Sequence, residues 1–185
     1  MKGNEPNTTR WVGVIGSWRA AARPFEKKVR ELVREAARRG EGIITGAAIG
    51  VDRIAIEEAL KFDPEAARLK VFLECGFEEF IGHYRKRAGQ GMVKREAAEA
   101  LIALISGLRG RNPAAVVDHP GTPFVDKAAY FARNTRIVEA ADSLAVFVTL
   151  SDTSVGAGTM DAVVKAKQKG IPVQVFERDK RSKFI

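Results

Sequence analysis

The stretch TGAAIGVD (residues 45–52) joins an apolar run at residues 42–45 to a helical pattern. Small residues at a strand-to-helix turn let backbone N–H groups approach an anion, and the following helix adds about half a positive charge at its N-terminus. Glycine-bearing turns occupy equivalent places at Gly16 and at GAGT (residues 156–159). If the three turns meet at one edge of a sheet, they form a phosphate site large enough for a nucleotide.

Strand and helix patterns alternate along the chain. Apolar runs predict buried strands at residues 11–15, 42–45, 69–73, 115–117, 143–150 and 172–176. Periodic apolar spacing predicts helices at residues 24–39, 51–60, 94–108, 124–141 and 158–169. This alternation indicates a single α/β domain over residues 1–185, Rossmann-like, with a parallel sheet between two layers of helices. Ligands of such sheets bind beyond the carboxyl ends of the strands, where all three glycine turns are expected.

Two segments fall outside this alternation. Residues 1–10 are polar and are expected to form a flexible N-terminus. Residues 76–91 contain the basic cluster HYRKR at residues 83–87. We expect residues 76–91 to be irregular and to form a lid or an insertion.

The charge of the chain favours anionic partners. Its 185 residues include 31 Lys and Arg against 23 Asp and Glu, so the net charge is +8, and the pI is near 9.8. A surplus of this size attracts polyanions and anionic ligands over long range, although thermophilic proteins also carry many charges for other reasons. The charge is thus compatible with nucleic acid as a partner and does not require it.

The single cysteine, Cys75, excludes an internal disulfide, a cysteine zinc cluster and an iron–sulfur site. We expect it to be a packed residue and not a nucleophile. Residues 1–10 lack the apolar core of a secretion signal, and no apolar run is long enough to span a membrane. We therefore expect a cytoplasmic protein with no membrane partner.

Several common site patterns are absent from the sequence. There is no G-x-G-x-x-G and no Walker lysine motif, so neither the usual dinucleotide fingerprint nor a P-loop ATPase is supported. The two histidines, His83 and His119, have no zinc-site spacing, and Ser17 lacks a G-x-S-x-G elbow. We expect no metal and no cofactor.

The first glycine turn offers three polar or aromatic side chains. The hydroxyl of Ser17 either donates to a phosphate or caps the next turn. Arg19 either holds two phosphate oxygens through its guanidinium or lies in solvent. Trp18 either stacks on a base or packs against its neighbours.

Later charged residues also allow two interpretations each. Asp52 is expected in the first turn of a helix, where the helix dipole stabilises a carboxylate without any function. Beside phosphate-binding amides it would repel phosphate, so it is also a candidate for binding a ribose hydroxyl or for general acid–base catalysis. Arg133 and Arg136 share a predicted helix face, where they either clamp a phosphate or point into water.

Taken in order, these motifs resemble the DNA-processing protein A (DprA/Smf) branch of the SLOG superfamily, which also contains the LOG cytokinin-activating hydrolases. TGAAIGVD is similar to the S-G-G-A-x-G-I-D segment of DprA. Arg133-Asn134, with Ala141-Asp142 eight residues on, is similar to its R-N-R and S-D segments. The resemblance implies the Rossmann-like fold predicted above.

The resemblance covers residues 12–176, apart from a divergent insertion at residues 76–122. At the first turn, Gly16-Ser17 fits the opening G-S-R of the family, but Trp18 replaces the arginine and Arg19 comes one residue later. We expect the C-terminal helical domain of many DprA proteins to be absent. The resemblance further implies a small standalone member that forms a homodimer or a higher homo-oligomer.

The LOG enzymes, which cleave the N-glycosidic bond of a nucleoside monophosphate, use a P-G-G-x-G-T-x-x-E motif and a preceding arginine. Gly156, Gly158 and Thr159 match this motif, and Arg133 matches the arginine. Ser154 and Val155 replace the proline and the first glycine, and Ala162 stands in place of the glutamate. Asp161 is adjacent to that position, but neighbouring helical residues point about 100° apart.

Two functional hypotheses follow. In the first, a non-catalytic DprA-like protein holds the phosphates of single-stranded nucleic acid, or of a nucleotide signal. In the alternative, a LOG-like hydrolase or transferase acts on the N-glycosidic bond of a nucleoside monophosphate, with Asp52 or Asp161 as the acid–base residue. A structural or sensory subunit that dimerises through its helices is a third, weaker possibility. The predicted ligand-binding residues are Gly16, Ser17, Arg19, Thr45, Gly46, Ala47, Gly50, Asp52, Arg133, Asn134, Gly156, Gly158 and Thr159.

Overall fold

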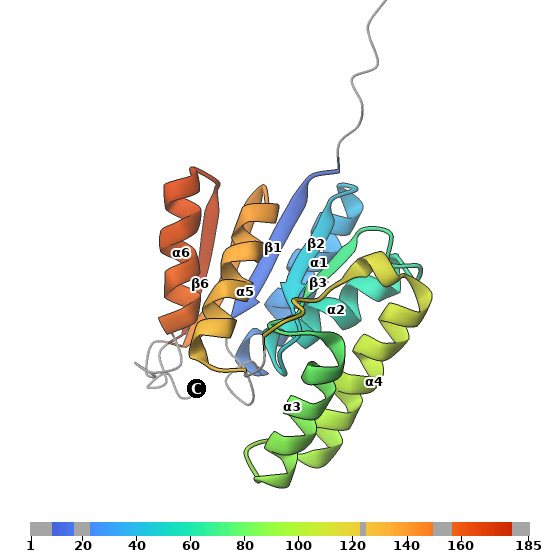
Figure 1. Cartoon of the computed structure of the whole chain (residues 1–185). Coiled ribbons are helices and arrows are strands. Elements are labelled where there is room, and N and C mark those ends of the chain that lie inside the picture. The colour runs from blue at the N-terminus through green and yellow to red at the C-terminus, as the bar shows by residue number, and fades with distance from the viewer. Residues whose placement is uncertain (1–8, 17–22, 123–124, 150–156, 179–185) are drawn as a thin grey trace, which may run out of the picture.

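The computed structural model describes residues 9–16, 23–122, 125–149 and 157–178. In these residues one parallel sheet contains six strands in the order β4-β3-β2-β1-β5-β6 (Figure 1). The strands are β1 (Trp11–Gly16), β2 (Gly42–Gly46), β3 (Leu69–Phe72), β4 (Val116–Val117), β5 (Ser143–Thr149) and β6 (Val173–Arg178). The α-helices are α1 (Glu26–Arg38), α2 (Val51–Phe62), α3 (Phe77–Gly89), α4 (Arg95–Arg111), α5 (Lys127–Ala140) and α6 (Ala157–Lys169).

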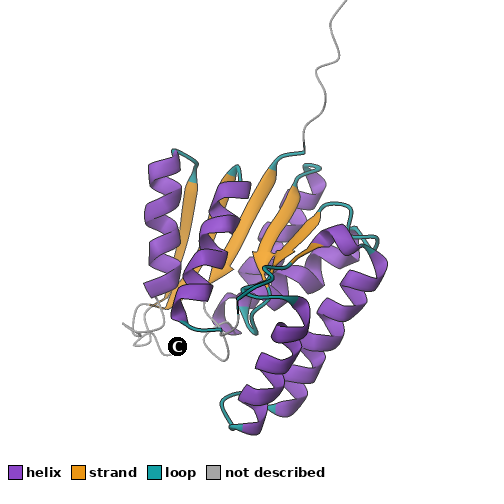
Figure 2. Ribbon diagram, in the orientation of Figure 1, coloured by secondary structure: helices purple, strands orange, loops and turns teal. Residues whose placement is uncertain are grey.

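The helices cover both faces of the sheet, as predicted. One buried cluster joins the sheet to α1, α2, α3 and α4, and a second joins it to α5 and α6. Figure 2 shows the strands between these two layers, and the α3–α4 hairpin extends past the carboxyl ends of the strands. The predicted three-layer, Rossmann-like α/β fold is therefore confirmed.

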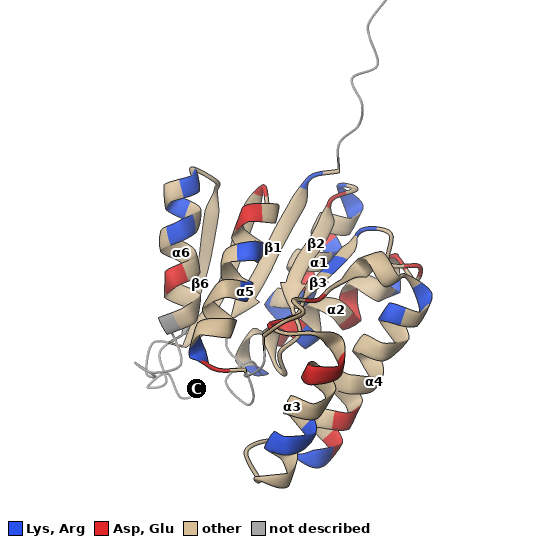
Figure 3. Ribbon diagram, in the orientation of Figure 1, with Lys and Arg blue, Asp and Glu red and all other residues tan. Residues whose placement is uncertain are grey.

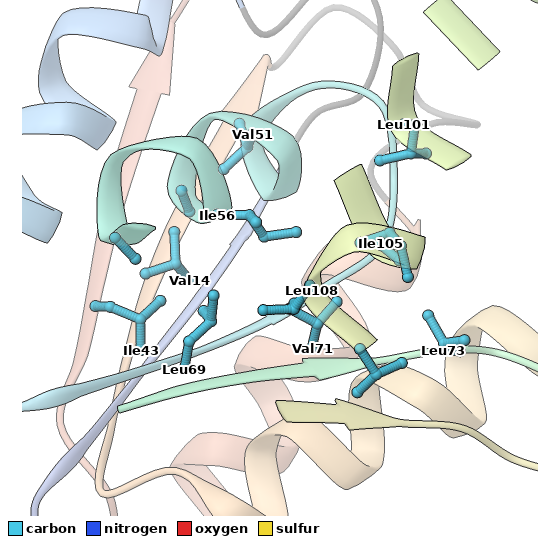
Figure 4. Close-up of a cluster of buried hydrophobic side chains, with 14 of the residues drawn as sticks. Val14, Ile43, Val51, Ile56, Leu69, Val71, Leu73, Leu101, Ile105 and Leu108 are labelled. Carbon is cyan, nitrogen blue, oxygen red and sulfur yellow. The ribbon is translucent and has the colours of Figure 1, made fainter. Parts of the chain in front are cut away.

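The larger core lies beneath α2 and α4 (Figure 4). Leu69 and Val71 of β3 belong to the same buried cluster as Leu101, Ile105 and Leu108 of α4. The three α4 residues recur at three- and four-residue spacing, so they share one face of the helix. That apolar face holds the hairpin against the sheet.

The structure corrects the expectation for residues 76–91. This segment is not irregular, because residues 77–89 form α3. Phe80 and Tyr84 are fully buried four residues apart and pack with their rings 4.9 Å apart. Of the basic residues beside them, Arg85 and Lys86 are exposed, whereas His83 and Arg87 are half-buried. The apolar periodicity of α3 was therefore present in the sequence, but glycines and charges obscured it.

The strand order reverses next to β1. From β1 the chain builds outward through β2, β3 and β4, and then returns to place β5 and β6 on the other side of β1. A crevice is expected beyond the carboxyl ends of β1 and β5, because the connections there diverge to opposite faces. Among the described helices, none combines the length and apolar character that a bilayer crossing requires.

Candidate functional site

A cleft of about 830 Å³ lies at this reversal of strand order. It is bounded by the end of β1, the turn after β2, one face of α3, the first half of α5 and the first turn of α6. Its lining residues are Ile15, Gly16, Ala48, Asp52, Glu79, Gly82, His83, Tyr84, Lys86, Arg87, Gln90, Met92, Val125, Asp126, Lys127, Tyr130, Phe131, Arg133, Asn134, Gly158 and Thr159. The volume falls in the range of small-molecule sites.

The two helical walls carry cations. Lys86 on α3 and Lys127 on α5 are exposed, and no ion pair among the described residues holds either ammonium group. Figure 3 shows Lys and Arg gathered in the last turns of α3. The nearby acid Asp126 is engaged locally, since its carboxylate caps α5 by accepting from the Ala129 N–H at 2.9 Å. Neither ammonium group is held by a carboxylate in the described part of the chain, and the Lys127 ammonium lies 5.5 Å from the centre of the Phe131 ring, so both charges are available to an anionic ligand.

A polar bridge connects the walls across the cleft. Arg87 donates to the Tyr130 hydroxyl at 3.1 Å, and that hydroxyl lies 3.1 Å from Nε2 of His83. Burial and the charges of Arg87 and Lys86 lower the pKa of His83 to about 4, so its ring is neutral at pH 7. Since Tyr130 accepts from Arg87, its own proton is free to bond the neutral ring. The bridge fixes aromatic surface within the cleft.

A buried ion pair forms the floor. Nη1 of Arg133 lies 2.8 Å from Oδ2 of Asp52, and the two side chains are 7% and 4% exposed. Asp52 also accepts from the Ala48 N–H at 3.3 Å. Burial raises the pKa of Asp52, while the charge of Arg133 opposes that rise. The pair is therefore the main electrostatic contact between α2 and α5.

A second buried carboxyl lies near the same guanidinium. Glu74 is 1% exposed, and neither of its carboxyl oxygens has a hydrogen-bond partner among the described residues. Burial raises its pKa, and the attraction of Arg133 only partly offsets that effect. Since no hydrogen bond from the residues that the structure describes offsets its burial, the rise in pKa favours the protonated form of the Glu74 carboxyl.

The RNTR segment (residues 133–136) ties α5 to its surroundings. Asn134 donates to the carbonyl of Gly158 at 3.1 Å, in the first turn of α6. The Thr135 hydroxyl accepts from Lys165 at 2.8 Å. Arg136 donates to the carbonyls of Leu73 and Asp118, at 3.2 and 3.1 Å. Arg133 and Arg136 thus hold other parts of the protein, and neither points freely into water.

Six of the predicted site residues line the cleft. They are Gly16, Asp52, Arg133, Asn134, Gly158 and Thr159. Gly16 serves close strand pairing as well, because a Cβ there would overlap the carbonyl oxygen of Phe147 on β5. Ser17, Arg19 and Gly156 lie outside the described residues.

The other predicted residues lie away from the cleft lining. Thr45 donates its hydroxyl to the Val14 carbonyl at 2.7 Å, and the Ala47 carbonyl accepts from Tyr84 at 3.1 Å. A Cβ on Gly46 would overlap the guanidinium of Arg133. The second glycine turn is therefore engaged mainly in internal contacts.

Gly50 and Asp161 are also placed elsewhere. Gly50, with a φ of 129°, precedes α2 and lines a separate groove of about 200 Å³ that also contains Arg23, Arg30 and Arg53. Asp161 on α6 pairs with Lys165 at 2.6 Å and does not line the cleft. Of the two acid–base candidates, Asp52 alone borders the cleft.

Sequence reasoning missed the side chains on the walls. Lys86 and Arg87 belong to the basic cluster that was assigned to a loop, so their common helical face was not recognised. Tyr130 precedes Arg133 by three residues and therefore shares its face of α5. The assignment of Arg133 to a helix is enough to predict that Tyr130 lies on the same face.

The sheet order and the cleft at its reversal define a Rossmann-like α/β protein with a ligand site at the carboxyl edge of the sheet. The family model described as DNA recombination-mediator protein A matches residues 1–183. The chain belongs to this family. No protein of curated function matches its sequence.

Solved structures with the same fold include two DprA proteins. DNA processing protein A from Helicobacter pylori, whose structure describes its binding of single-stranded DNA, is 19% identical with a TM-score of 0.66; 95% of this chain aligns to 68% of that one. DprA from Streptococcus pneumoniae is 15% identical with a TM-score of 0.59, over 94% of this chain and 52% of that one. A molybdenum cofactor binding protein from Rippkaea orientalis is 20% identical with a TM-score of 0.53, over 94% and 80% of the two chains.

Proposed function

We propose that the cleft binds single-stranded nucleic acid through its phosphates and bases. The observation that carries this proposal is the combination of two unpaired ammonium groups, Lys86 and Lys127, with the aromatic rings of Tyr130 and Phe131 in one cleft. Cations that follow a backbone and rings on which bases stack are the two parts of a single-strand site. The net charge of +8 adds long-range attraction for a polyanion.

Family membership supports the same ligand. The Helicobacter pylori relative binds single-stranded DNA, and its structure shares the fold over most of this chain. The cleft here lies where ligands of parallel α/β sheets bind, at the reversal of strand order. Fold and chemistry therefore favour the same class of ligand.

The phosphate contacts are assigned to the first turn of α6 and to the walls. Gly158 and Thr159 border the cleft at the N-terminal end of α6, where the backbone N–H groups of a first helical turn and the helix dipole favour an anion. Lys86 and Lys127 would bind further phosphates of the same strand. In this proposal Arg133 positions the floor, because its charge is already paired with Asp52.

Fluorescence anisotropy of labelled single-stranded DNA at several salt concentrations tests the proposal. Lys86→Ala and Lys127→Ala should each weaken binding and lower the slope of log K against log salt by about 0.7, the value for one phosphate contact on a single strand. Lys27→Ala is the matched control, because this α1 lysine is 91% exposed and does not line the cleft. If the slope of log K against log salt is equal for all three variants, the cleft is not the binding site.

One observation supports the alternative function, which is hydrolysis of a glycosidic bond. Asp52 borders the cleft, where its carboxylate, paired with Arg133, would act as the acid–base residue. Incubation with nucleoside monophosphates should then release free base, and Asp52→Asn should stop the release. Absence of base release from every common nucleotide would leave binding as the function.

A further inference from the structure

We infer that Gly82 of α3 is the point where a bound nucleobase lies directly against the helix backbone, and that its missing side chain limits the size of the base that fits. This inference rests on the proposed function, because it assigns a role within the same cleft. It adds a specificity-determining residue that neither the glycine turns nor the cations supply.

The protein itself gives no reason for glycine at this position. Gly82 lies in the interior of α3, is exposed and lines the cleft. A Cβ built on it would meet no atom within 4 Å, and its φ is not among the positive values found at other glycines. Glycine weakens a helix interior relative to alanine. Gly89 and Gly107 are equally open glycines within helices, and Gly82 differs from them in that it lines the cleft, so the space in front of it is open to a ligand.

The direction in which Gly82 faces is fixed by its neighbours. Phe80 and Tyr84, two residues before and two after Gly82, are fully buried, and Tyr84 bonds the Ala47 carbonyl. His83 is held by the Tyr130 hydroxyl. A helix anchored in this way cannot rotate the bare backbone of Gly82 away from the cleft. The surface at Gly82 is preformed, so a ligand meets it without any rearrangement.

The surroundings of this bare surface match one nucleotide unit. Lys86 follows Gly82 by four residues, so it lies on the same face of α3 about 6 Å further along the axis. A phosphate bound by Lys86 would bring its sugar and base within reach of Gly82. A flat ring makes full van der Waals contact with a helix surface only where no side chain stands. The bare surface at Gly82 therefore suits a planar group, and the nucleobase of the proposed ligand is such a group.

Two substitutions at Gly82, with a matched pair elsewhere, test this role. Gly107 of α4 is the control, because it is also an exposed glycine inside a helix whose Cβ would meet no atom, but it does not line the cleft. Gly82→Ala and Gly107→Ala should both raise the Tm by about 2 °C, since each improves its helix. Only Gly82→Leu should weaken binding of labelled oligo(dT), by about tenfold or more, while Gly107→Leu should bind as the wild type does.

A comparison of two homopolymers adds a readout that a purely structural role would not move. Gly82→Ala should reduce the affinity for oligo(dA) more than that for oligo(dT), because the larger purine ring meets the added methyl group first. If Gly82→Leu binds both strands as the wild type does while Lys86→Ala and Lys127→Ala lose affinity, the role of Gly82 is refuted and the cleft proposal stands. If the lysine variants also keep the affinity and salt slope of the wild type, both the role of Gly82 and the proposed binding cleft are refuted.

Discussion

The guanidinium of Arg133 occupies the space directly in front of Gly46, where a Cβ on any other residue would overlap it. The same guanidinium reaches Asp52, which lies 81 residues earlier in the sequence. The absence of a side chain on Gly46 therefore leaves the space that the buried Arg133 guanidinium fills. A phosphate at this position would have to displace that arginine.

The first prediction concerns this contact. Gly46→Ala should lower the free energy of unfolding by about 3 to 5 kcal/mol, because the displaced guanidinium leaves Asp52 buried without its cation. In an Arg133→Ala background the same substitution should cost about 1 to 3 kcal/mol less, since the two residues no longer compete for space. Urea denaturation of the wild type, both single variants and the double variant gives the coupling energy. Gly89→Ala controls for the effect of alanine itself, because a Cβ there meets no atom within 4 Å.

Independent effects of Gly46→Ala and Arg133→Ala would contradict this account. The same geometry also makes Arg133→Ala a poor probe of nucleic-acid binding. Its loss of folding stability would be mixed with any loss of phosphate contact. The exposed lysines of the walls avoid that ambiguity.

The second prediction concerns Glu74. Its pKa is raised by burial, so the folded protein holds a proton that the unfolded chain loses near the ordinary value of 4.5. The folded state then binds more protons above that pH, and this residue makes the wild type less stable as the pH rises. Glu74→Gln has no proton to lose, so its stability relative to the wild type should be greater at pH 8 than at pH 5. Urea denaturation at both pH values measures the change.

The outcome that counts against this account is a stability difference between Glu74→Gln and the wild type that is the same at pH 5 and pH 8. The comparison cancels the other titrating groups, because both proteins carry them. An equal difference at the two pH values would show that Glu74 is ionised in the folded state and is held by electrostatic attraction alone.

The third prediction concerns His83. Its pKa is lowered from 6.5 to about 4, so between these values the unfolded chain binds a proton that the folded protein resists. Stability should therefore decrease as the pH falls from 6.5 towards 4. His83→Gln keeps a polar side chain near Tyr130 but does not titrate. Its Tm should fall less than that of the wild type between pH 7 and pH 5, and scanning fluorimetry in matched buffers measures both.

A parallel decline of the two Tm values would show that His83 is not the group responsible. Tyr130→Phe provides a separate control, since it removes the hydroxyl and leaves the imidazole. If the lowered pKa arises mainly from burial and from Arg87 and Lys86, the pH dependence should persist in that variant.

The fold was predictable because alternating strands and helices have few compatible arrangements. Apolar runs at Trp11 and Ser143 and the spacing of Leu101 with Ile105 identified their elements directly. The ends of helices were less certain, and α4 continues three residues past the predicted end, to Arg111. Helix ends depend on capping and packing contacts that periodicity does not contain.

The site was predictable only in its position. Gly16, Asp52, Arg133 and Gly158 line the cleft, because parallel strands bring their carboxyl ends to one edge, and their contact with a ligand stays a prediction. The sequence could not show that Arg133 already has a carboxylate partner, since that contact joins distant residues. The walls were missed for a similar reason, as their cations share a face only once α3 is known to be a helix.

The pairing of Asp52 with Arg133 also orders the assembly of the chain. Asp52 and Glu74 are synthesised well before the cation whose charge acts on both, because 81 residues separate Asp52 from Arg133. Until α5 docks, both carboxyl groups keep either water or a proton, since a bare buried charge is too costly. Water is therefore excluded from the centre of the sheet only when the second half of the chain packs onto it. Docking of α5 therefore completes the floor of the cleft.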